Sequence, residues 1–122
     1  MEATEKPETP DILSSPSVTR TTLQVTPLVP LHRSAAVEVR RITMAPGLAA
    51  GYHVHNCPVF GNIVEGSVIY QIEGGPESVL RAGDVFYEPA NTPIARFDAT
   101  DEGVVFLGYF LLEDGQTPEI TT

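Results

Sequence analysis

The chain is poor in basic residues, and it contains no long apolar run. Seven lysines and arginines stand against sixteen acidic residues among 122, which gives a formal net charge of −9. Such a surface repels phosphate backbones and anionic lipid headgroups, so neither nucleic acid nor a membrane is expected as a partner. No apolar stretch approaches the roughly 20 residues that span a bilayer, and the N-terminus lacks a basic-then-apolar leader. The sequence therefore predicts a soluble, cytoplasmic protein.

Cysteine is almost absent, and several familiar motifs are missing. Cys57 is the single cysteine, so no internal disulfide can form, which suits a reducing compartment. Gly74 and Gly75 lie in a hairpin-like stretch and not in a strand-to-helix phosphate loop, so nucleotide binding is not indicated. The chain also lacks a Gly-x-Ser-x-Gly motif and zinc-finger spacing.

What the chain does contain is turn chemistry at regular spacing. Eleven prolines and ten glycines separate short β-prone runs, a pattern typical of an all-β sandwich or barrel. The runs are 23–29, 35–44, 52–54, 59–64, 67–73, 78–81, 84–88, 93–98 and 103–112. We expect one antiparallel barrel over residues 20–113, a flexible arm over 1–19 and a polar tail over 114–122.

A pair of histidines is the strongest chemical signal. His53 and His55 are two residues apart, so on a strand their side chains point to the same face. Two imidazoles side by side on the inner wall of a barrel suit chelation of one transition metal. A single histidine is more often a satisfied core residue, but the pair stands between Gly47 and Gly66, and a functional site is favoured.

These residues carry a resemblance to a known family. Gly47-x5-His53-x-His55 with Gly66 resembles the first cupin motif, and residues 83–89 (GDVFYEP) resemble the start of the second. The resemblance covers roughly residues 25–112. It implies a double-stranded β-helix, jelly-roll-like and commonly dimeric, with a ligand pocket inside the barrel. Cupins include dioxygenases, isomerases, epimerases, decarboxylases, lyases and non-enzymatic binders, so the resemblance does not choose a reaction.

Two of the usual cupin ligands are missing. The family motif places a glutamate four residues after the second histidine, where this chain has Val59, and a histidine five residues after the proline, where it has Ile94. Neither side chain can donate an electron pair. Two imidazoles alone bind a metal weakly, because a tightly held ion needs at least three protein donors.

Glu88 is the best candidate for a third donor. Alternation in GDVFYEP puts Phe86 and Glu88 on one face of the strand, and the position before this proline commonly faces the pocket in cupins. A second interpretation gives Glu88 a salt bridge with Arg96 inside the barrel. The two interpretations are compatible, and both leave Glu88 and Arg96 as candidate catalytic residues beside His53 and His55.

Apolar side chains are expected to form the walls of the pocket. Ile63, Phe86 and Ile94 are the candidate substrate-binding residues of this kind. Tyr70 joins them as either a core aromatic residue or a phenolic hydrogen-bond donor to substrate.

Three functions fit this sequence. The first is an isomerase, cyclase or lyase that works by proton transfer without a metal, with His53 or His55 as base. The second is a metal-dependent oxygenase, isomerase or lyase with a reduced shell of His53, His55 and Glu88 holding one loosely bound Fe, Mn, Ni or Zn ion. The third is a non-catalytic barrel that binds a small molecule.

The last apolar run predicts an interface. In 104–112 (VVFLGYFLL) strict alternation leaves about half of the apolar side chains facing outward. Outward apolar residues on a small β protein usually mark a contact surface. We therefore expect a homodimer in which the N-terminal arm is exchanged.

Overall fold

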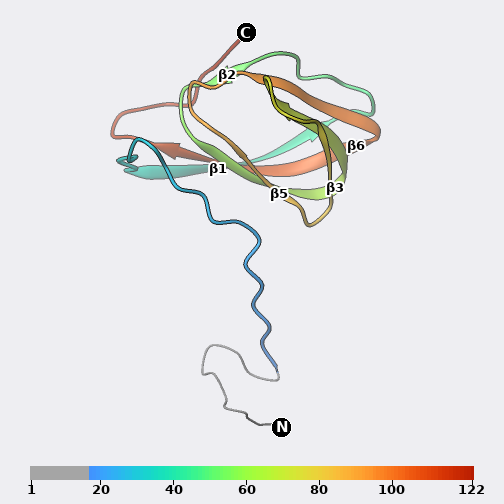
Figure 1. Ribbon diagram of the computed structural model, residues 1–122, viewed down its shortest axis with the longest axis horizontal. Helices are drawn as coiled ribbons and strands as arrows, with labels where there is room; N and C mark the ends of the chain where they lie inside the picture. Colours follow the sequence, from blue (N-terminus) through green and yellow to red (C-terminus); the bar gives the residue numbers. More distant parts are fainter. Residues whose placement is uncertain (1–16) are drawn as a thin grey trace.

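The computed structural model describes residues 17–122, and these form an antiparallel all-β fold, as predicted (Figure 1). The predicted N-terminal arm falls mostly on residues 1–16, which lie outside the described residues. Within residues 17–122, no helix is long and apolar enough to cross a membrane. The strands are β1 (Ala36–Met44), β2 (Val54–His55), β3 (Val59–Ile72), β4 (Ser78–Arg81), β5 (Val85–Glu88), β6 (Ile94–Leu112) and β7 (Ile120–Thr121).

The main sheet has the order β1-β6-β3-β4, and β5 also pairs with β3. Two long strands, β3 and β6, form its centre and bend sharply (Figure 1). Where short runs and turns are expected around Gly66 and around residues 101–103, the strands continue through β-bulges. Gly66 and Gly103 have positive φ values of 78° and 70°, a conformation that glycine adopts without strain. The two glycines let the paired strands bend together, which wraps the sheet around its core.

The core lies between the inner faces of these strands. Three phenylalanine rings pack against one another in its centre: the Phe97 ring centroid lies 4.8 Å from that of Phe106 and 5.2 Å from that of Phe86, and both pairs are tilted. Such contacts stabilise aromatic pairs by about 0.5–1.5 kcal/mol beyond the burial of their area. A smaller cluster joins Cys57 and Phe110 to Val59 and Leu112. Cys57 is therefore a buried apolar side chain.

The end of β6 follows the predicted alternation. Val104, Phe106, Phe110 and Leu112 are buried, whereas Val105, Leu107, Tyr109 and Leu111 are only partly covered. The run 23–29 forms no strand. Residues 17–31 instead leave the barrel as an extended segment (Figure 1), and Val29 and Leu31 in it are about nine-tenths exposed.

The tail after β6 is ordered against the site. Strand β7 pairs with β2, with His55 opposite Ile120. The side chain of Asn56 holds this tail with two hydrogen bonds. Its amide nitrogen donates to the Thr117 carbonyl at 2.9 Å, and its oxygen accepts from the backbone amide of Glu119 at 2.8 Å. Three residues of this tail, Pro118, Glu119 and Ile120, line the same cavity as His55.

Replacing Asn56 with alanine is expected to release this tail. The variant loses two hydrogen bonds, each contributing about 0.5–1.5 kcal/mol, so amide exchange over residues 117–121 should accelerate by roughly 10-fold or more. Hydrogen–deuterium exchange read by mass spectrometry measures this change. Asn62→Ala is the matched control, because the Asn62 side chain instead accepts a hydrogen bond from the Tyr109 hydroxyl. Equal exchange of the tail in both variants would contradict the prediction.

Candidate functional site

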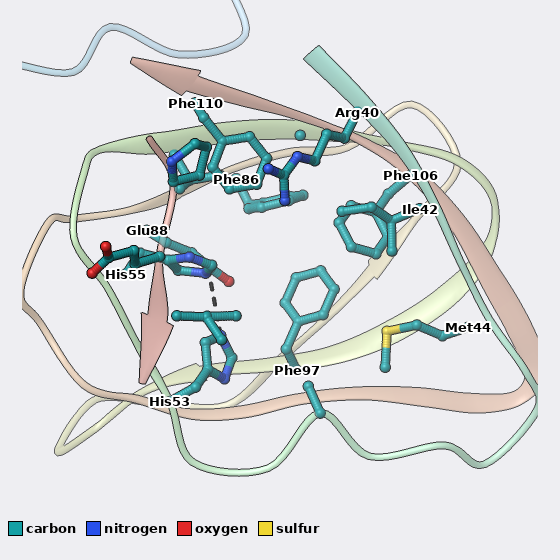
Figure 2. A pocket seen from close by; sticks show the side chains of 16 residues that line it. Arg40, Ile42, Met44, His53, His55, Phe86, Glu88, Phe97, Phe106 and Phe110 are labelled. Carbon is teal, nitrogen blue, oxygen red and sulfur yellow. Dashed lines mark ion pairs between the residues drawn. The ribbon is translucent and has the colours of Figure 1, made fainter. Parts of the chain in front are cut away.

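The structure brings His53, His55 and Glu88 together at the wall of one cavity (Figure 2). His53 lies just before β2, and its backbone exchanges two hydrogen bonds with Ile94, at 3.1 and 2.8 Å. His55 is the last residue of β2, and Glu88 is the last residue of β5. All three side chains are buried, with exposed fractions of 4%, 8% and 3%. Buried ionisable groups of this kind need partners, and here they are partners to one another.

The three side chains converge on a single point. Glu88 Oε1 lies 2.7 Å from His55 Nε2 and 3.7 Å from His53 Nε2. One nitrogen or oxygen atom from each residue lies within 4.8 Å of those from the other two. Atoms at such separations can all reach one ion at the usual distance of about 2.0–2.2 Å after small side-chain movements. Among the described residues, this is the group with the geometry of a metal site.

Backbone contacts orient His53 for this role. Its Nδ1 lies 2.8 Å from the Gly51 carbonyl oxygen, which can only accept a hydrogen bond. The Nδ1 proton is therefore fixed on that side, and in the neutral ring Nε2 presents its lone pair toward Glu88. Metal-binding histidines commonly donate the hydrogen of their other ring nitrogen to a backbone carbonyl in this way, which fixes the tautomer.

The charges of the cluster are mutually dependent. The contact with the Glu88 carboxylate raises the pKa of His53, although burial of the ring acts in the opposite direction. Burial would raise the pKa of Glu88, but the contacts with His53 and His55 outweigh it and hold that pKa below its ordinary value. In the absence of a metal, an anionic Glu88 and a cationic His53 stabilise each other.

This coupling predicts a pH optimum for the stability of the metal-free protein. A raised pKa for His53 stabilises the fold below the unfolded value, about 6.5, and this contribution is lost as pH rises through the folded pKa. A lowered pKa for Glu88 stabilises the fold above about 4.3, and this contribution is lost as pH falls. Melting temperature in the presence of chelator should therefore be highest between roughly pH 5 and 6.

Glu88→Gln removes the charge on which both contributions depend. Thermal melts of this variant across the same pH range should show a flatter profile than the native chain. An unchanged profile would mean that other groups set the pH dependence.

Glu88 lies close to the place of the glutamate ligand that the cupin motif has and this chain lacks. Val59, where the cupin motif has a glutamate, pairs directly with Glu88 across β3 and β5. Both residues line the cavity. A carboxylate on β5 thus lies beside the position from which the motif glutamate would act. Ile94, where the motif has a histidine, is fully buried, and no donor among residues 17–122 joins the cluster in its place.

Arg96 does not pair with Glu88, and that interpretation is wrong. Its guanidinium contacts Asp98 at 2.8 Å and Glu77 at 2.9 Å, on the outside of the sheet. The reason is a β-bulge: Gln71 pairs with Arg96 but Ile72 pairs with Ile94, which leaves Ala95 as an extra residue. The extra residue reverses the alternation, so Ile94 points inward and Arg96 outward.

The candidate wall residues divide into two groups. Phe86 lines the cavity, but Ile63, Tyr70 and Ile94 do not and lie in or against the core. The Tyr70 hydroxyl donates to the Tyr87 carbonyl, and burial raises the pKa of Tyr70, so the phenol stays protonated. Of the two interpretations of Tyr70, the structure therefore favours the core aromatic residue.

The cavity has a volume of about 210 Å³ and is mostly apolar. Sequence reasoning missed most of its walls, although the apolar alternation in β1 could have indicated Ile42 and Met44. The large side chains in the lining that it missed are those of Arg40, Ile42, Met44, Phe97, Phe106, Phe110, Glu119 and Ile120. A compact cavity with a few converging polar groups is typical of a small-molecule site.

Comparisons with known proteins agree with this geometry. Residues 40–108 match the family model described as the cupin domain. No significant match was found among curated proteins. A cupin-like protein from Thermotoga maritima has a similar solved structure, with a TM-score of 0.59 and 26% identity over 68% of this chain and 62% of that one.

Several of the similar structures are enzymes. The DMSP lyase DddQ from Ruegeria pomeroyi aligns with a TM-score of 0.61 and 23% identity, covering 70% of this chain and 43% of the lyase. An oxalate oxidase in complex with the substrate analogue glycolate aligns with a TM-score of 0.60 and 24% identity, covering 70% of this chain and 45% of the oxidase. This chain thus spans less than half the length of either enzyme, and at these identities the likeness shows the fold alone.

Proposed function

The chain belongs to the cupin family, and we propose that it is a small-molecule enzyme that binds one divalent metal ion through His53, His55 and Glu88. The observation that carries this proposal is the convergence of three buried donor atoms within 4.8 Å at the wall of a cavity. Two histidines and one carboxylate form a ligand set that suits Fe, Mn, Ni or Zn and leaves coordination positions open for substrate. When bound, the ion would act as a Lewis acid toward a substrate oxygen.

The chain's own residues prepare the site for that ion. The Gly51 carbonyl fixes the orientation of His53, and the contacts of Glu88 with the two histidines lower its pKa, which keeps a charged donor ready. Phenylalanines form apolar walls beside the cluster, and an apolar surrounding strengthens polar interactions inside the cavity. The reaction falls among the lyase, isomerase and oxygenase classes.

Metal analysis of protein purified without a His-tag tests the proposal. We expect close to one equivalent of a divalent transition metal in the native chain, and its loss in His55→Ala. His32→Ala is the matched control, because His32 bonds to Ser34 near the surface, away from the cluster. Metal-free native protein that stays metal-free after incubation with Fe, Mn, Ni and Zn would refute the proposal.

A second candidate is acid–base catalysis without a metal. The 2.7 Å contact between His55 Nε2 and Glu88 Oε1 favours it, because a carboxylate bonded to an imidazole is a familiar proton-transfer pair. In this case His55 would take a proton from substrate, and Glu88 would stabilise the imidazolium. Turnover that persists in excess chelator would select this candidate over the metal enzyme.

We also propose that two copies associate through the outer face of the main sheet. Half-exposed Val37 and Val39 on β1 flank the outward side chains Leu107 and Leu111 of β6. The extended segment 17–31 adds further uncovered apolar side chains that a second copy would bury. Light scattering should give twice the 13.2 kDa mass of one chain. A stable monomer at micromolar concentration would refute the dimer.

A further inference from the structure

One basic side chain, Arg40, stands among the apolar walls of the cavity, and neither proposed chemistry uses it. Arg40 lies on β1 on the same face as Ile42 and Met44, which also line the cavity. Its ladder partner on β6 is Gly108, which has no side chain to fill the space in front of it. Figure 2 shows the guanidinium beside Phe110, apart from His53. The guanidinium carbon lies 4.8 Å from the centre of the Phe110 ring.

The guanidinium has unused hydrogen-bonding capacity. Its Nε and one terminal nitrogen both contact a single oxygen of Glu38, each at 2.6 Å. A guanidinium carries five N–H donors, and within residues 17–122 the second terminal nitrogen has no partner. The side chain is 45% exposed, so it can turn its free edge to a ligand without breaking a buried network. Stacking on Phe110 holds it in place.

The ionisable groups of the cavity stand at two places that share one neighbour. The ring centroid of Phe110 lies 5.9 Å from that of His55, in the cluster, and 4.8 Å from the guanidinium carbon of Arg40. A volume of about 210 Å³ limits the ligand to a compact molecule. Arginine binds carboxylates in a planar, bidentate manner that fixes orientation as well as affinity.

We infer that the substrate is a small organic carboxylate with a short apolar body, whose carboxylate binds Arg40 while its other end faces the cluster. This inference rests on the proposed function for the cluster's role as the reacting end. The apolar body would lie against Phe86, Phe97 and Phe106, which bind hydrocarbon and offer no polar contact. Arg40 is thus a positioning and specificity-determining residue.

Matched pairs of probes test this inference: benzoate against benzamide, and 3-methylbutanoate against 3-methylbutanamide. In excess chelator, where no metal can bind the carboxylate, ligand-observed NMR should show each acid binding roughly 10-fold or more tighter than its amide, the value of a charge-assisted hydrogen bond. Arg40→Met should abolish the preference. Arg41→Met is the control, because Arg41 is the next residue on β1 and points to the opposite face.

A variant with the opposite effect covers the case in which Arg40→Met fails to fold. Glu38→Gln removes the competing carboxylate and should tighten acid binding several-fold. Equal affinity for acid and amide in the native chain, no binding of either acid at millimolar concentration, or no gain in Glu38→Gln would overturn the inference. Metal content measured in parallel separates the two proposals. Arg40→Met should keep its metal, since Arg40 is not a ligand. If the proposed function is wrong, the native chain itself binds no metal.

Discussion

Replacing Glu88 with glutamine is expected to weaken divalent metal binding by at least about 100-fold, because it removes the only anionic donor of the cluster. Loss of a residue that merely supports a ligand already costs about 10–100-fold, and Glu88 is a proposed ligand itself. The substitution preserves the size of the side chain and its ability to accept a hydrogen bond from His55. The fold should therefore survive, and competition with a chromogenic chelator measures the affinity.

Two further variants make this result specific. Glu119→Gln is the matched control, since Glu119 also lines the cavity but is exposed. Adding Val59→Glu to Glu88→Gln places a carboxylate on the neighbouring strand, directly across the ladder, and should restore part of the affinity. If Glu88→Gln binds metal as tightly as the native chain, Glu88 is no ligand and the three-residue site is wrong.

Replacing Gly66 with alanine is expected to destabilise the fold by more than about 4 kcal/mol, or to prevent folding. A Cβ at this position would overlap the carbonyl oxygen of Gly103 and lie 2.8 Å from its carbonyl carbon. Both neighbours are backbone atoms of β6, so no side chain can move aside. The positive φ of 78° adds a further cost for any residue other than glycine.

Gly74→Ala separates the two causes. Gly74 has a similar φ of 81°, but a Cβ there would meet nothing within 4 Å. Only the conformational cost of about 1–2 kcal/mol applies to it. Urea denaturation of both variants measures the difference. Equal losses at the two sites would show that the close approach of β3 and β6 at Gly66 is not what constrains the strands.

The local patterns in the sequence predicted much of the fold and the centre of the site. Alternation placed Phe86 and Glu88 on one inner face, and it placed two histidines side by side; the structure has both arrangements. These predictions depend only on the two-residue period of a strand. The cupin motifs then supplied the topology, which the short strands and turns could not specify alone.

The remaining features depend on contacts between distant segments. The bulge at Ala95 reverses the face of Arg96, and nothing in the local sequence marks that extra residue. The pairing of His55 with Ile120 closes a separation of 65 positions, and the side chain of Asn56 holds it. Arg40 belongs to the cavity because Gly108, far away in the chain, pairs with it.

The facing positions Val59 and Glu88 also bear on how such a site can change over generations. Because the two side chains meet across one ladder, a lineage can acquire an acid at one position before losing it at the other. A carboxylate then remains at the site throughout the change. Relatives of this chain should therefore be classified by whether either of the two positions carries a carboxylate. Inspection of one motif alone would count a relocated ligand as a lost one.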